Sequence, residues 1–299
     1  MLVTGASGFL GRPVVRALLR AGHQVVAVGR SHPHVPDVEF IEADLLNARQ
    51  TDDVVRQAGA SHLMHLAWDI SHRDFWTSSL NHGWVTATGR LAHAFLAHGG
   101  TRIVGAGSCA EYAPAHLVSL KETDPIAPTT LYGQAKVEAC RRVADACRAR
   151  GASWAWGRIF IPYGPGDAPN RLIPSLFEVF LRRWPPFPVN VDDVRDFIHA
   201  DDVASAMVAL MEGSATGPAN VATGIPTSIA RVVSEVARTC GRHADEILLE
   251  PPRGGPARGQ GTGLWLVGEP ATLHQLGWQP RWTLADAFRQ MASEYRASC

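Results

Sequence analysis

The sequence lacks any excess of charge and any long apolar run. Lysine and arginine together number 28, as do aspartate and glutamate, and the isoelectric point is near 7.2. Such a balance gives no reason to expect a nucleic-acid surface or a polybasic membrane patch. No apolar stretch reaches the roughly 18 to 20 residues that span a bilayer, and the first residues lead into a strand rather than a signal peptide. We therefore expect a cytoplasmic protein without nucleic-acid or membrane partners.

Patterns typical of disulfides and metal sites are also scarce. The five cysteines are odd in number and show no paired metal spacing, so we expect reduced thiols. The 13 histidines are dispersed, without an HExxH motif or a histidine and cysteine cluster of the zinc type. The sequence therefore predicts no metal site.

What the sequence does contain is a regular alternation of short apolar runs and longer helical patterns in its first half. The 299 residues are 46% hydrophobic, enough to bury a large core. Strands that alternate with helices predict a parallel sheet covered on both faces. We predict an α/β fold, a doubly wound parallel sheet of the Rossmann type, with long helices over residues 76–98 and 131–150.

After about residue 160 this regularity breaks. Segments such as YGPGDAP and WPPFP separate shorter elements. We predict a Rossmann domain over residues 1–160 and a smaller, discontinuous substrate-binding lobe over residues 161–299, with segments around 195–225 returning to the first domain. In such folds ligands bind beyond the carboxyl ends of the strands.

A glycine-rich loop, GASGFLGR, follows the first predicted strand and opens the first helix. Gly5 permits a tight turn, Gly8 lets a pyrophosphate approach the backbone, and Gly11 allows close packing of helix on sheet. The helix N-terminus offers free N–H groups and partial positive charge to phosphates. In this context the loop predicts a dinucleotide site rather than an ordinary glycine-rich turn.

Two arginines indicate which dinucleotide binds. An NAD site usually has a carboxylate about twenty residues after the loop, where it bonds the adenosine ribose. Here that position is Arg30, and a guanidinium suits a 2′-phosphate. Arg12 can approach the same phosphate, so the pair favours NADP(H) over NAD(H), although either arginine alone could simply be solvated. Asp44, after the third predicted strand, is placed to contact the adenine or is a solvated loop carboxylate.

A second motif, YGQAK, places Tyr132 and Lys136 on one face of a predicted helix, because they are four residues apart. We expect the Lys136 ammonium to lower the pKa of Tyr132, which could then exchange a proton with a carbinol or carbonyl oxygen. Ser108, just past the fifth predicted strand, is placed to hydrogen-bond the same oxygen and to orient it for hydride transfer.

With these motifs the chain resembles the extended short-chain dehydrogenases/reductases of the nucleotide-sugar epimerase/dehydratase type. The resemblance covers nearly the whole chain and implies an enzyme. Relatives of this type dimerise through a four-helix bundle, so we expect a homodimer through the helices at 76–98 and 131–150. The further matching pieces are His65-Leu66-Ala67, Asn81, Tyr163-Gly164-Pro165-Gly166, Arg195-Asp196-Phe197-Ile198-His199, Asp201-Asp202, Asn220 to Gly224, and Leu276 to Pro280.

The resemblance also implies a role for single residues. Ser108, Tyr132 and Lys136 would carry the chemistry, with Lys136 also holding the nicotinamide ribose. The cofactor would contact Gly5, Ser7, Gly8, Phe9, Leu10, Arg12, Arg30, Asp44, Leu45, Leu66, Ala67, Tyr132 and Lys136. The substrate would contact Asn81, Cys109, Arg171, Arg195 and Arg253, with Arg195 near the diphosphate of a sugar nucleotide.

Departures from the family pattern narrow the reaction. Family 4,6-dehydratases carry an aspartate and a glutamate where this chain has Cys109 and Ala110, so dehydration is disfavoured. Cys109 is either an acid or base for epimerisation or a small space-filling residue, as buried cysteines mostly are. Glu111, one place further on, is either recruited in place of the missing carboxylates or, as we expect, a residue that supports the local turn. Residues 160–162 replace an asparagine expected near the diphosphate, and several tryptophans could line the pocket, which leaves a hydrophobic ketone as an alternative substrate.

The leading hypothesis is an NADPH-dependent ketoreductase that reduces the C4 keto group of an NDP-4-keto-6-deoxyhexose, because NADPH is a reductant that must enter and leave. The alternative is an NAD(P)-dependent nucleotide-sugar epimerase, which would use the same triad with a retained cofactor. A reductase of a hydrophobic non-sugar ketone is a further alternative. A non-catalytic NADP(H)-sensing module is the least favoured, because the triad is complete.

Overall fold

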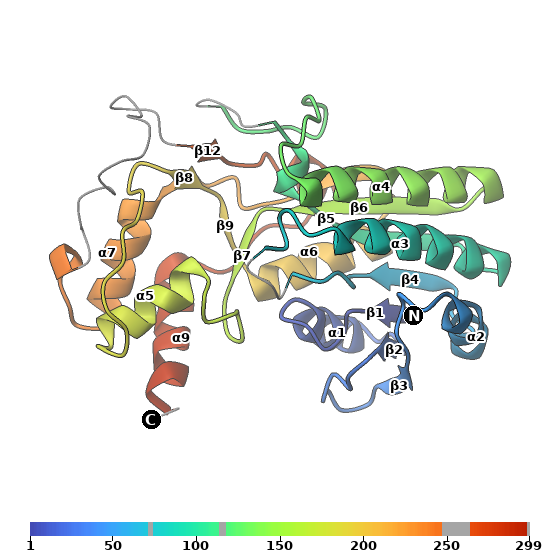
Figure 1. The fold of residues 1–299 in the computed structure, drawn as a ribbon, viewed down its shortest axis with the longest axis horizontal. Coiled ribbons are helices and arrows are strands. Elements are labelled where there is room, and N and C mark those ends of the chain that lie inside the picture. The colour runs from blue at the N-terminus through green and yellow to red at the C-terminus, as the bar shows by residue number, and fades with distance from the viewer. Residues whose placement is uncertain (71–73, 114–117, 247–263, 298–299) are drawn as a thin grey trace.

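A seven-stranded parallel sheet forms the centre of the larger part of the molecule (Figure 1). The computed structural model describes residues 1–70, 74–113, 118–246 and 264–297. The strands lie in the order β10-β6-β5-β4-β1-β2-β3. The strands that follow β1 are added toward one edge of the sheet up to β3, and those from β4 onward are added toward the other edge, so the strand order switches between β1 and β4. Their bounds are β1 Leu2–Thr4, β2 Val26–Gly29, β3 Glu39–Glu42, β4 His62–His65, β5 Arg102–Ser108, β6 Ser153–Ile159 and β10 Gly217–Val221.

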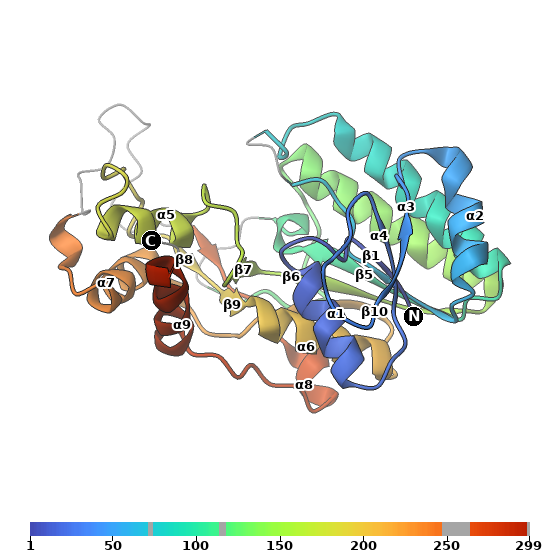
Figure 2. The same cartoon turned by 90° about the horizontal axis from the view of Figure 1, so that it is seen from below.

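Helices cover both faces of this sheet (Figure 2). On one face α1 (Gly11–Arg20) packs against α6 (Ala200–Glu212). On the other face α3 (Leu80–Ala97) packs between α2 (Ala48–Ala58) and α4 (Leu131–Arg150). The predicted doubly wound α/β class is therefore confirmed.

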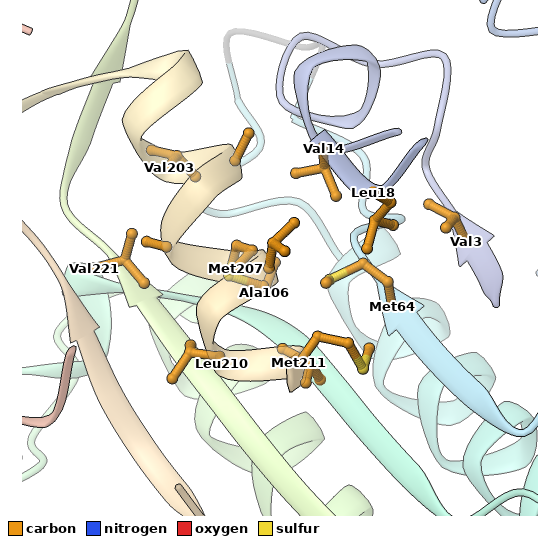
Figure 3. Close-up of a cluster of buried hydrophobic side chains, with 14 of the residues drawn as sticks. Val3, Val14, Leu18, Met64, Ala106, Val203, Met207, Leu210, Met211 and Val221 are labelled. Carbon is orange, nitrogen blue, oxygen red and sulfur yellow. The ribbon is translucent and has the colours of Figure 1, made fainter. Parts of the chain in front are cut away.

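The apolar core under α1 and α6 fixes the first helix on the sheet (Figure 3). Val14 and Leu18 lie one helical turn apart on α1 and are fully buried, as periodicity of an amphipathic helix requires. They belong to one cluster with Met207 of α6, Val3 of β1 and Met64 of β4. The loop that precedes α1 is thereby held against the ends of β1 and β4.

The long helix expected over residues 76–98 begins later, at Leu80. Residues 74–79 form turns instead, in which the N–H groups of Thr77 and Ser78 both donate to the Asp74 carbonyl. The Trp76 carbonyl accepts a hydrogen bond from the Tyr132 N–H at 3.0 Å, so this segment contacts the start of α4.

A smaller lobe has a separate core of buried side chains from α5, α7 and α9. Its elements are α5 Leu172–Phe180, α7 Ile229–Thr239, α9 Leu284–Ala297, the short sheet β11 (Thr227–Ser228), β8 (Val194–Arg195) and β12 (Trp265–Leu266), and the pair β7 (Ile161–Tyr163) and β9 (Phe197–His199). The remaining short helices are η1 Cys109–Glu111, η2 Ala244–Glu246 and α8 Ala271–Gln275.

The chain crosses between the two parts more than once. After β9 it returns to the large sheet, where α6 packs on α1 and β10 pairs with β6. Buried Asp196 holds these segments together, because its carboxylate accepts hydrogen bonds from the backbone N–H groups of Thr223, Gly224 and Gly268. Among the described helices, each is too short or too polar to cross a bilayer.

Candidate active site

The glycine loop lies at the carboxyl end of β1, directly before α1. Gly5 has a left-handed φ of 72°, and a Cβ there would lie 2.7 Å from the backbone of Leu66 and Ala67 after β4. A Cβ on Gly11 would lie 2.0 Å from the Gly5 carbonyl oxygen. Both positions therefore require glycine, and the loop folds tightly beneath the first turn of α1.

The N-terminus of α1 fits the pyrophosphate of a dinucleotide. No side chain caps this helix end and its first turn carries no acidic residue, so its N–H groups and the helix dipole favour an anion. Gly8 is exposed, which lets phosphate oxygens reach the backbone, and half-buried Ser7, Phe9 and Leu10 surround it. The residues expected to hold the phosphates are thus in one loop.

The expected adenosine end of the cofactor site lies at the ends of the neighbouring strands. Arg12 and Arg30 are both exposed, and neither guanidinium hydrogen-bonds or pairs with another described residue. Asp44 follows β3 and accepts the Leu46 N–H at 3.0 Å through one carboxylate oxygen. Leu45 is buried in the core between the sheet and α2 and α3.

Ser108, Tyr132 and Lys136 meet at the carboxyl end of β5. Their side chains are buried, and the Ser108 side chain is close enough to the Tyr132 hydroxyl to influence its pKa. Ser108 ends β5, while Tyr132 and Lys136 lie one turn apart on α4. This helix begins at Leu131, where Thr130 caps it by accepting the Gly133 N–H at 3.1 Å. The structure therefore places a proton-exchanging phenol against a hydroxyl donor.

The electrostatics of this triad differ from the expectation. Burial raises the pKa of Tyr132 well above its ordinary value, and the nearby Ser108 side chain only partly opposes this. Burial also lowers the pKa of Lys136 to about 7, so the lysine gives weak support to a phenolate. Its Nζ donates to the Ala106 carbonyl at 2.9 Å. The prediction that Lys136 lowers the pKa of Tyr132 is wrong in this arrangement, because burial of the phenol raises that pKa.

An aromatic enclosure surrounds the Tyr132 ring. Trp68, Phe75 and Trp76 contact it edge-on, with ring centroids 6.3, 5.1 and 5.4 Å away. The Lys136 Nζ lies 3.8 Å from the centroid of a Trp68 ring, a cation–π contact. The sequence pointed to tryptophans near the pocket, but Phe75 gave no signal because it lies in a turn far from either motif.

The residues expected to bind substrate differ in their burial and in their hydrogen-bond partners. Asn81 is buried, and its amide donates to the Phe75 and Ser78 carbonyls while its oxygen accepts the Trp68 Nε1–H, so it supports the enclosure. Cys109 is buried in a small apolar cluster, and burial raises the pKa of its thiol to about 12, which suits a space-filling role. Arg253 lies outside the described residues.

The two remaining substrate candidates are arginines. The Arg171 guanidinium carbon lies 5.6 Å from the centroid of the Phe75 ring, which itself contacts the Tyr132 ring. Arg195 donates to the Asp193 carboxylate at 2.8 Å, which offsets much of its charge. Arg195 lines a cavity of about 300 Å³ in the smaller lobe, whose other walls are mainly apolar, among them Ile161, Leu172, Phe187, Val189 and Ile229.

A glycine-loop Rossmann domain with a buried serine, tyrosine and lysine at the end of β5 defines an oxidoreductase of the extended short-chain dehydrogenase/reductase type. Residues 1–223 match the family model described as the NAD dependent epimerase/dehydratase family. The match spans well over half of the 299 residues, and the chain belongs to this family.

Three curated relatives cover most or all of the chain. A UDP-glucose 4-epimerase of Azospirillum brasilense is 25% identical in an alignment that covers 100% of this chain and 92% of that protein. A dTDP-6-deoxy-L-talose 4-dehydrogenase (NAD(P)(+)) of Kitasatospora kifunensis is 26% identical over 97% of this chain and 93% of its own. A 3-diazoavenalumate denitrifying reductase of a Streptomyces species is 30% identical over 86% of this chain and 84% of its own.

The fold also matches solved structures over its full length. The structure of MoeE5 in complex with UDP-glucuronic acid and NAD has a TM-score of 0.85 and 29% sequence identity, and the match covers 100% of this chain and 99% of that one. The arrangement of the sheet, its helices and the smaller lobe is therefore that of the family.

Proposed function

We propose that this chain is an NAD-dependent nucleotide-sugar 4-epimerase. The observation that carries the proposal is the burial of Ser108 and Tyr132 beside each other, with Lys136, at the carboxyl end of β5. Such a serine and tyrosine can exchange a proton with a sugar oxygen in either direction. Support for epimerisation comes from the UDP-glucose 4-epimerase that aligns with the whole chain and from the likeness to MoeE5 with a UDP-sugar and NAD.

The chain's own residues would manage the proton and the orientation of the sugar. NAD, when bound, would take up a hydride from the sugar carbon and return it. The Ser108 hydroxyl would hydrogen-bond the reacting oxygen and fix its direction. As a phenolate, Tyr132 would accept the hydroxyl proton while the carbinol is oxidised, and it would give that proton back to the ketone oxygen after the sugar has turned over. No proton is gained or lost over the cycle.

The cofactor assignment differs from the sequence-based preference for NADP(H). The family description names NAD, and the MoeE5 complex contains NAD. An epimerase also regenerates its cofactor in each cycle, so tight retention of NAD is compatible with turnover. The glycine loop and the uncapped α1 bind the pyrophosphate that NAD and NADP share, which leaves the choice to Arg12, Arg30 and their surroundings.

The test is to release and identify the nucleotide held by the purified protein and to follow UDP-glucose by NMR. We expect close to one NAD per chain and formation of UDP-galactose without net absorbance change at 340 nm. Tyr132→Phe should retain NAD while turnover falls by about 100-fold or more, because the proton carrier is removed. An empty protein that consumes added NADPH stoichiometrically with a keto substrate would overturn the epimerase proposal.

A second candidate is an NAD(P)H-dependent ketoreductase, possible on the same triad. The observation that favours it is the pair of exposed guanidinium groups, Arg12 and Arg30, without described partners beside the cofactor loop. The raised pKa of Tyr132 also suits a proton donor. Two relatives point the same way, because one is named as a reductase and another as a 4-dehydrogenase of a 6-deoxy sugar using NAD(P)(+).

Steady-state assays with NADPH and NADH separate the two candidates. The substrates should include NDP-4-keto-6-deoxyhexoses and an apolar aryl ketone, because the cavity by Arg195 is mainly apolar. For a reductase we expect Arg12→Ala with Arg30→Ala to lower the preference for NADPH by about 10-fold or more, since each guanidinium contributes a charge-assisted contact to the 2′-phosphate. An unchanged preference would remove the argument for NADP(H).

A further inference from the structure

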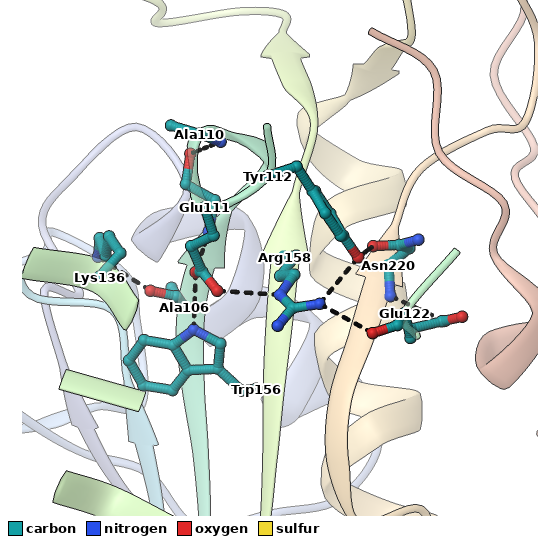
Figure 4. Close-up of polar contacts among 10 residues, drawn as sticks. Ala106, Ala110, Glu111, Tyr112, Glu122, Lys136, Trp156, Arg158 and Asn220 are labelled. Atoms are coloured by element: carbon teal, nitrogen blue, oxygen red, sulfur yellow. Dashed lines mark hydrogen bonds and ion pairs between the residues drawn. The ribbon is translucent and has the colours of Figure 1, made fainter. Parts of the chain in front are cut away.

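A buried carboxylate, that of Glu111, accepts hydrogen bonds from the Trp156 and Arg158 side chains (Figure 4) and from the Ser108 backbone. The Glu111 side chain is almost fully buried, at 1% exposed, and both of its oxygens are occupied by the protein. Its Oε1 accepts hydrogen bonds from the Ser108 backbone N–H and from the Trp156 Nε1–H, each at 2.9 Å. Its Oε2 accepts the Arg158 Nε–H, also at 2.9 Å. The carboxylate therefore joins the end of β5 to β6.

The sequence of β5 makes room for this carboxylate and its partner indole. A Cβ on Gly105 would lie 2.2 Å from the Trp156 ring. A Cβ on Gly107 would lie 2.3 Å from the Trp156 Nε1 and 2.5 Å from the Glu111 Oε1. Any side chain at these two positions would displace Trp156 or Glu111, so the glycines of β5 and the buried carboxylate belong to one arrangement.

The hydrogen bonds continue from Glu111 to the region where the chain returns from the smaller lobe. The Arg158 Nη1 donates to the Tyr112 hydroxyl at 2.9 Å, and that hydroxyl donates to the Asn220 Oδ1 at 2.7 Å. The Asn220 amide donates to the Leu120 carbonyl at 2.8 Å. Ser108 is thus connected through side chains to β6, to β10 and to the Leu120 carbonyl.

A buried ion pair of this kind needs an explanation other than stability. Removing a carboxylate and a guanidinium from water costs free energy that their attraction only partly repays, and apolar replacements are often at least as stable. What the pair does supply is direction, because three donors converge on one carboxylate with fixed geometry. One of those donors is the backbone of Ser108, whose hydroxyl must meet Tyr132.

We infer that Glu111, held by Trp156 and Arg158, is a positioning residue that fixes Ser108 for its contact with Tyr132 and the reacting oxygen. Glu111 does not touch the substrate and acts through Ser108. The inference rests on the proposed function only for the catalytic role of Ser108, and it holds equally for epimerisation and for ketone reduction.

The test is a double-mutant cycle between Glu111→Gln and Ser108→Ala on the full chain loaded with cofactor. In the presence of Ser108, we expect Glu111→Gln to lower kcat by about 10- to 100-fold, as small misplacements of reacting groups do. KM should change by less than about threefold, because Glu111 contacts no substrate. In the Ser108→Ala background, the same change should cost less than about twofold, because the group that Glu111 positions is gone.

A purely structural role would lower kcat equally in both backgrounds, and that result would overturn the inference. If Ser108→Ala itself left turnover unchanged, the proposed function would fail instead, so the two failures are distinguishable. The matched control is Glu138→Gln, which removes a carboxylate of the exposed pair with Arg141 on α4. Its kcat should equal that of the unmodified chain.

Glu111→Gln leaves Arg158 buried without its charge partner and could unfold the chain. The variant Glu111→Gln with Arg158→Met removes both charges and should be carried through the same cycle, with the thermal midpoint and retained cofactor as checks of folding.

The pH dependence of turnover is an independent test. The negative charge of Glu111 raises the pKa values of Tyr132 and Lys136. Its removal should therefore shift the alkaline limb of the profile of kcat against pH to lower pH. An unmoved limb together with additive costs would reject the inference.

Discussion

His65, at the end of β4, connects three elements beneath the cofactor loop. Its Nδ1 lies 2.7 Å from the Thr4 hydroxyl of β1, and its Nε2 lies 2.9 Å from the Thr88 hydroxyl of α3. The imidazole is buried, and burial, reinforced by nearby Lys136, lowers its pKa to about 3. The neutral ring therefore holds the end of β1, from which the glycine loop begins.

Replacing His65 should reduce the sensitivity of the fold to acid. The folded state disfavours the imidazolium, so the stability from neutral His65 is complete above the unfolded pKa of about 6.5 and is lost as pH falls toward 3. Between pH 7 and pH 5 the unmodified chain should lose about 2 kcal/mol more than His65→Gln, at about 1.4 kcal/mol per pKa unit. Urea unfolding at both pH values measures the difference.

The control for this prediction is His93→Gln, which changes an exposed histidine on α3 and should keep the full pH dependence of the unmodified chain. Equal losses of stability in His65→Gln and in the unmodified chain would show that His65 is not the titrating group.

Single residues also show how far the sequence could predict the site. Tyr132 and Lys136 could be paired from their spacing, because a helix fixes the relation of residues four apart. The support that Ser108 receives from Glu111 could not be predicted, because the partners that hold Glu111, Trp156 and Arg158, are 45 and 47 residues away on another strand. Asn81 looked available for substrate, but its partners in a turn appear only when the chain is folded.

At the scale of elements, the alternation of apolar runs and helical patterns was sufficient to predict the sheet and both helix layers. It was less informative where the chain leaves the regular pattern. The start of α3 lies at Leu80 because Thr77 and Ser78 close turns onto the Asp74 carbonyl and the Trp76 carbonyl accepts from Tyr132 at the start of α4. In the smaller lobe, strands of two or three residues carry too little periodicity to be recognised.

The junction of the glycine loop with α1 should not tolerate a single added methyl group at Gly11. A Cβ there would lie 2.0 Å from the Gly5 carbonyl oxygen, so the first turn of α1 must move away from the pyrophosphate position. We expect Gly11→Ala to weaken cofactor binding by at least about 10-fold, since misplaced N–H groups lose contacts to the phosphates. Fluorescence titration with NAD measures this change.

The matched control is Gly83→Ala on α3. A Cβ at Gly83 would meet the Leu46 and Leu80 side chains at ordinary contact distances of 3.6 and 3.9 Å, so the change should leave cofactor affinity unaltered. It should also stabilise the fold by about 0.5 to 1 kcal/mol, because alanine favours a helix over glycine. If both substitutions had the same effect on NAD binding, the steric argument for Gly11 would be refuted.

At the scale of the whole molecule, α3 and α4 form the outer layer through which the family resemblance implies a homodimer (Figure 1). The outward residues of α4 are charged rather than apolar. Arg141 bonds to Glu138 at 2.7 Å and to Asp145 at 3.0 Å, and Arg148 bonds to Asp145 at 2.7 Å. A dimer through this face would be polar and sensitive to salt, unlike an obligate interface with an apolar core.

We expect the chain to form such a homodimer and to dissociate when the charge pattern of α4 is reversed. Across a two-fold axis each charge meets the same helix of the partner, so Arg141→Glu with Arg148→Glu would place like charges together and favour the monomer. Light scattering after size exclusion, at low and at high salt, measures the mass. Arg238→Glu reverses a charge of an exposed pair on α7 and should leave the dimer intact. A dimer that survives the α4 double variant uses another face, and a monomeric unmodified chain would remove the prediction altogether.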